Sequence, residues 1–145
     1  MRIIISLLLI FCSYAMQAKN LKVNRKEEIK SIKLNIENVE PTQSGSIVYV
    51  SLIQKKNFSY NISFSDIYLS IPNESIKIKG KVFEWDNDRK AVSDTKSISD
   101  KEKSSMSIWF PDITLSKDDT FDIKIGDLLD RNRTELIVTD VKAKK

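Results

Sequence analysis

The sequence predicts an all-β protein, a two-sheet antiparallel β-sandwich of about eight short strands. Apolar residues recur at every second position in one segment after another, which is the period of a half-buried strand. Clusters of turn-forming residues separate these segments at the short spacing expected of a sandwich. Helical periodicity is nearly absent, and only residues 126–131 suggest a turn of helix.

The first 18 residues have the three-part organisation of a secretory signal peptide. A short basic start precedes residues 3–11, an apolar run too short to span a bilayer comfortably. Cleavage after Ala15 or after Ala18 would release the mature chain, and the first option places small residues at both recognition positions. A lipoprotein anchored through Cys12 is the alternative, but Phe11 stands where a small residue should precede the modified cysteine. We therefore expect a secreted or periplasmic protein.

Residues 19–30 are polar, and we expect them to form a flexible or short helical lead-in to a single domain over residues 31–145. Turn-forming residues at 40–45 should join the first two strands of that domain as a hairpin. A short pairing at residues 95–98 is expected to be local. The strands expected in chain order are residues 32–36, 47–53, 60–64, 67–71, 76–85, 106–110, 121–125 and 136–141.

Residues 75–94 form the stretch around which the chain is organised. Gly80 interrupts the alternation of the strand, which predicts a bulge or a corner between two packed sheets. Beyond it, Phe83 and Trp85 fall on the face that lysines occupied, and they suit either a protein interface or the core. The two faces consist of Ile76, Ile78 and Val82 on the apolar side and of Lys77, Lys79 and Lys81 on the basic side.

The composition excludes several kinds of catalytic chemistry. The chain has no histidine, and its one cysteine, Cys12, leaves with the predicted signal peptide. Thiolate nucleophiles, Ser-His-Asp triads and the common zinc sites are therefore excluded from the mature protein. Paired carboxylates can cleave glycosides, but the two tryptophans are thin support for an aromatic sugar cleft. We expect a protein that is not an enzyme.

A loop rich in carboxylates follows the organising strand. Asp86, Asp88 and Asp94 lie on it, and residues 86–130 hold eleven acidic residues against seven basic ones. Calcium binds six to eight hard oxygen ligands, and clustered aspartates on loops commonly supply them. The loop therefore predicts a calcium site, although Asp-Asn-Asp is also ordinary turn chemistry.

Residues 47–71 resemble the opening of the C-two domains, the calcium-dependent, phospholipid-binding sandwiches of the protein kinase C and synaptotagmin type. An alternating strand runs into Asn57-Phe58, which is similar to the family's short Asn-Leu step. The segment Ser65-Asp66-Ile67-Tyr68-Leu69 then resembles the family's Ser-Asp-Pro-Tyr-Val motif. Ile67 stands where the family has proline.

The same resemblance assigns the third calcium loop in two alternative registers. In one, residues 84–88 with Asp94 resemble the family's Asp-x-Asp pair and later aspartate. In the other, residues 121–127 form the entering strand, and Asp127 and Asp130 are the ligands. The lysine-lined strand resembles the family's lysine-rich strand, which implies anionic lipid headgroups as a second ligand. The calcium ligands implied in this way, taken together, are Asp66, Asp86, Asp88, Asp94, Asp127 and Asp130.

Two classes of function are compatible with these observations. One is a module that binds calcium and an anionic membrane surface through the acidic loops and through Lys77, Lys79 and Lys81. The other is an exported subunit, inhibitor or surface adaptor that binds a protein partner and holds no metal. In neither class do we expect nucleic acid or a small-molecule substrate.

Overall fold

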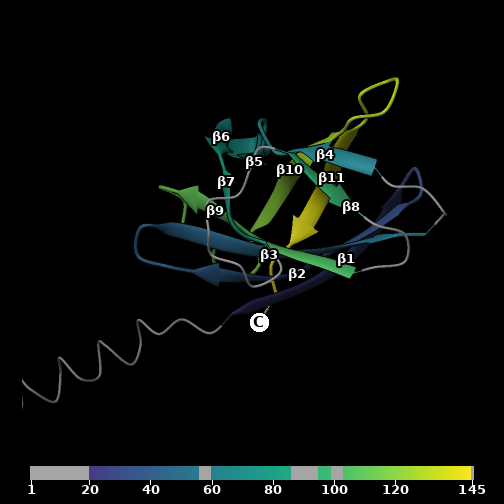
Figure 1. Cartoon of the computed structure of the whole chain (residues 1–145). Coiled ribbons are helices and arrows are strands. Elements are labelled where there is room, and N and C mark those ends of the chain that lie inside the picture. The colour runs from purple at the N-terminus through teal and green to yellow at the C-terminus, as the bar shows by residue number, and fades with distance from the viewer. Residues whose placement is uncertain (1–19, 56–59, 86–94, 99–102, 145) are drawn as a thin grey trace, which may run out of the picture.

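A computed structural model describes residues 20–55, 60–85, 95–98 and 103–144 (Figure 1). The described residues form eleven strands and one short 3-10 helix, arranged as two antiparallel sheets packed against each other. The predicted β-sandwich is confirmed. The elements in chain order are β1 (Leu21–Ile29), β2 (Ile32–Pro41), β3 (Gly45–Gln54), β4 (Tyr60–Ser63), β5 (Tyr68–Ile71), η1 (Pro72–Glu74), β6 (Ile76–Lys79), β7 (Lys81–Trp85), β8 (Thr95–Ile98), β9 (Lys103–Pro111), β10 (Thr120–Leu128) and β11 (Glu135–Lys142).

The two sheets differ in size. The five-stranded sheet has the order β1-β2-β3-β9-β7, and the six-stranded sheet has the order β6-β5-β10-β4-β8, with β11 paired to β10. The apolar core lies between them and includes the fully buried rings of Phe110 and Phe121. Alternation explains this core, because Leu34 and Ile36 of β2 point inward while the lysine between Ile32 and Leu34 is exposed. Each fully buried side chain of this size contributes about 1.5–3 kcal/mol to stability.

Gly80 is the point where the chain crosses from one sheet to the other. Strand β6 belongs to the six-stranded sheet and β7 to the five-stranded sheet, so the predicted corner is confirmed. The backbone N–H of Gly80 donates to the carbonyl of Ile67 over 2.9 Å. A Cβ atom at this position would overlap the ring of Phe110, so a side chain here would force the ring or the corner to shift.

The expected lead-in at residues 19–30 is wrong, because residues 21–29 form strand β1. Leu21 and Val23 are buried while the residues that follow each of them are exposed, so the first part of the strand has one apolar face. It lies at the edge of its sheet and pairs with β2. The backbones of Lys22 and Lys144 also exchange hydrogen bonds of 2.9 and 2.8 Å, which join the two ends of the described chain.

Two smaller expectations are also wrong. Residues 126–131 contain no helix, because residues 126–128 complete β10 and the chain then turns toward β11. Strand β8 does not pair locally, because its described partner is β4. Strand β8 pairs with a strand far away along the chain, whereas residues 126–128 pair with β11, the next strand, as well as with the distant β4.

Candidate functional site

The lysine-lined strand is divided between the two sheets. Lys77 and Lys79 lie on β6, Lys81 lies on β7, and all three are exposed. The Nζ atom of Lys77 lies 4.1 Å from the ring centroid of Tyr68, which is the geometry of a cation–π contact. Lys79 and Lys81 flank the corner at Gly80, so lysines of two different sheets are neighbours there.

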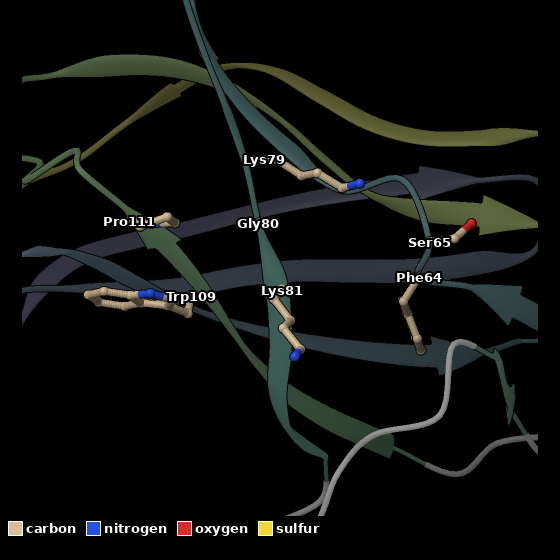
Figure 2. A pocket seen from close by; sticks show the side chains of 7 residues that line it. All are labelled: Phe64, Ser65, Lys79, Gly80, Lys81, Trp109 and Pro111. Carbon is tan, nitrogen blue, oxygen red and sulfur yellow. The ribbon is translucent and has the colours of Figure 1, made fainter.

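A cavity of about 520 Å³, which we name the corner hollow, lies at this crossing (Figure 2). In Figure 2, Trp109 and Pro111 lie on one side of the strand that carries Gly80, and Phe64 and Ser65 lie on the other. Three segments far apart in the sequence thus surround one cationic, partly aromatic space. Its lining residues are Phe64, Ser65, Lys79, Gly80, Lys81, Trp109 and Pro111.

A second, smaller cavity of about 200 Å³ adjoins the first, and we name it the apolar hollow. It is lined by Ile47, Lys81, Phe83 and Trp109. Ile47 of β3 pairs with Trp109 of β9, which pairs with Lys81 of β7, so these three residues form one row across the sheet. Lys81 and Trp109 line both hollows. Of the two aromatic residues considered from the sequence, Phe83 lines this hollow, and the side chain of Trp85 lies outside the described structure.

The acidic residues predicted to bind calcium are found in three different settings. Asp86, Asp88 and Asp94 lie outside the described residues. Asp66 and Asp127 both contact Lys124, and Asp130 accepts hydrogen bonds from Thr134. Within the described ranges, no group of three or more histidine, cysteine or acidic residues is arranged to hold a metal ion. Calcium binding at the loop of residues 86–94 stays a prediction from the sequence.

Lys124 of β10 is buried, with 3 % of its side chain exposed. It was not predicted from the sequence as a site residue. Its Nζ lies 2.7 Å from Asp66, 3.1 Å from Asp127 and 3.3 Å from Glu135. Asp127 is itself buried, whereas Asp66 and Glu135 are exposed. The sequence does not predict this cluster, because Asp66 is 58 residues from Lys124 and residues three apart in a regular strand face opposite sides. Strand β10 is irregular at this point, with a register shift between Lys124 and Gly126.

The electrostatics of the cluster favour the charged forms of Lys124 and Asp66. Burial lowers the pKa of Lys124, but hydrogen bonds to Asp66, Asp127 and Glu135 outweigh burial and leave it above its ordinary value. The hydrogen bond from Lys124 lowers the pKa of Asp66, and the charges of Lys77 and Lys79 add to that effect. Lys124 thus supplies the positive charge that the described carboxylates of this cluster require.

Asp130 has a structural role in the turn between β10 and β11. Its two carboxylate oxygens accept hydrogen bonds from the backbone N–H of Thr134 at 2.9 Å and from its hydroxyl at 2.8 Å. These hydrogen bonds lower the pKa of Asp130. Among the ion pairs of the described residues, Lys124 has Asp66, Asp127 and Glu135 as partners, and Asp130 is not one of them.

Comparison with known proteins identifies a solved structure with a similar fold. No family model and no curated protein sequence matches the chain. The crystal structure of the yjhA protein from Bacillus subtilis superposes with a TM-score of 0.57 at 9 % identity. The match covers 82 % of this chain and 98 % of that one. At this identity the likeness is one of fold alone. No helix in the described residues is long and apolar enough to cross a membrane.

Proposed function

We propose that the protein is an exported, non-enzymatic binding module, and that the corner hollow is where it binds an anionic partner. One observation carries the proposal: Lys79 and Lys81 reach the same hollow from two different sheets, beside Trp109 and Phe64. A lysine that is exposed only for solubility does not need a neighbouring lysine from a second sheet. Here the crossing at Gly80 places both lysines in the lining of a hollow that Phe64 and Trp109 also line.

The chemistry of the hollow favours a partner that carries negative charge. Lys79 and Lys81 are exposed, and within the described part of the chain neither forms an ion pair. Lys77 adds a third positive charge on β6, the strand that carries Lys79. Complementary charge raises the rate of encounter and the specificity of binding, while aromatic walls supply contact area.

Charge reversal at the hollow tests this proposal. The mature protein should bind fluorescent polyglutamate or vesicles that contain phosphatidylserine, measured by anisotropy and by co-sedimentation. In Lys79→Glu/Lys81→Glu, the affinity should fall by about tenfold or more, since two attractive contacts become repulsive.

A matched control has the same change in net charge elsewhere on the molecule. Lys26 and Lys117 are exposed lysines of β1 and of the turn between β9 and β10. The Lys26→Glu/Lys117→Glu variant should keep most of the binding. Equal losses in the two variants, or no binding of either probe to the wild type, would contradict the proposal.

A further inference from the structure

The two hollows together define the kind of partner more narrowly than the positive charge of the lysines alone does. Because Lys81 and Trp109 line both, a ligand that fills them must place an anionic group directly beside an apolar one. Ile47 and Lys81 lie two strands apart in one row, which is a separation of about 10 Å at about 4.8 Å per strand. Side chains on the same face of an extended peptide are about 7 Å apart, so two residues at positions i and i+2 can direct one side chain toward each end of the row.

The shape of the site favours a chain segment over a membrane. Lys79 and Lys81 line a hollow at a corner, between Phe64 on one side and Trp109 and Pro111 on the other (Figure 2). A lipid surface is broad and contacts protruding groups, whereas an extended segment can enter a hollow between walls. The apolar hollow beside it suits a single aliphatic or aromatic side chain.

The edge of β7 does not favour binding by strand addition. The strand has five residues, begins with Lys81, and shifts register against β9 between Val82 and Glu84. A short edge with a lysine and a bulge is the usual protection against pairing with another chain. Recognition therefore depends on side chains rather than on a backbone ladder.

Building on the proposed function, we infer that the partner is an acidic, extended segment of another protein that carries an apolar side chain next to its carboxylates. The carboxylates bind at Lys79 and Lys81, and the apolar side chain occupies the hollow of Ile47, Phe83 and Trp109. This assignment fixes the class of partner and the role of each half of the site.

A pair of labelled peptides tests the inference. One repeats Glu-Glu-Leu-Leu, so that each face of the extended chain carries glutamate and leucine in turn, and the other has the same length and consists of glutamate alone. The wild type should bind the first about tenfold more tightly, which is the discrimination that burying about one leucine side chain supplies. In Ile47→Thr/Phe83→Thr this preference should disappear while binding of polyglutamate persists.

The control removes equivalent apolar groups at half-buried positions that line neither hollow. Ile53 of β3 and Ile137 of β11 are half-buried, and Ile53→Thr/Ile137→Thr should keep the tenfold preference. Circular dichroism and melting curves should show that all variants are folded. Binding of phosphatidylserine vesicles that depends on Lys79 and Lys81, without preference for the leucine peptide, would overturn this inference and leave the proposed function intact. Failure of every anionic probe would overturn both.

Discussion

Lys124 is a buried lysine that neutralises carboxylates on the six-stranded sheet. Its buried ammonium group contacts three carboxylates, of which Asp127 is buried with it. A charge left alone in the interior is costly, so the pair is held together by the penalty of separating it. Sequence alone cannot reveal this role, because an exposed lysine and a buried one look the same within an alternating strand.

Lys124→Met should lower the free energy of unfolding by about 3 kcal/mol, because it leaves the carboxylate of Asp127 buried without a counter-charge. Urea denaturation at neutral pH measures the loss. Lys142→Met is the control, since Lys142 is exposed and lies 4.0 Å from Asp118, and it should cost less than about 0.5 kcal/mol. Lys124→Met/Asp127→Asn should regain part of the loss. Equal costs for the two single variants would contradict this role for Lys124.

The pH dependence of stability should have a defined sign. The pKa of Asp66 is lowered in the folded protein, so its contribution is present above its unfolded pKa of about 3.9 and is lost as pH falls through the folded value. The raised pKa of Lys124 contributes fully below its unfolded value of about 10.4 and is lost only at higher pH. The difference between wild type and Lys124→Met should therefore shrink in acid.

At the level of elements, the crossing from β6 to β7 depends on Gly80. Gly80→Ala should destabilise the protein by about 1–3 kcal/mol, because the added methyl group would overlap the ring of Phe110. The free energy of unfolding from urea titration measures this change. In a Phe110→Leu background the same substitution should cost much less, since the smaller side chain leaves room. An unchanged cost in that background would show that the ring is not the obstacle.

The sequence was sufficient for elements whose signal is local. Alternating apolar residues identified the strands of the core, and Gly80 identified the corner. It failed for β1, because an edge strand with only a few buried residues looks like a polar lead-in. For the candidate site it identified the lysines but not Phe64 and Trp109, because these two residues line the same hollow only after both sheets have assembled.

On the scale of the whole molecule, the segment that contains β6 and β7 contributes an edge strand to each of the two sheets. Strand β6 ends the six-stranded sheet and β7 ends the five-stranded sheet, and in Figure 1 the two lie next to each other. The corner hollow therefore lies where the edges of the two sheets meet, and residues of both sheets contribute to it. Strand β1 lies at the opposite edge of the five-stranded sheet from β7.

Nuclear magnetic resonance mapping of the labelled mature protein with the glutamate-leucine peptide tests the binding site most directly. Shift changes should be concentrated on the backbone amides of Gly80 and Lys81 and on the indole N–H of Trp109, and added salt should weaken them. The amides of Lys26 and Lys117 should stay unchanged. Shift changes spread evenly over the basic residues, or centred on β1, would contradict binding at the corner hollow.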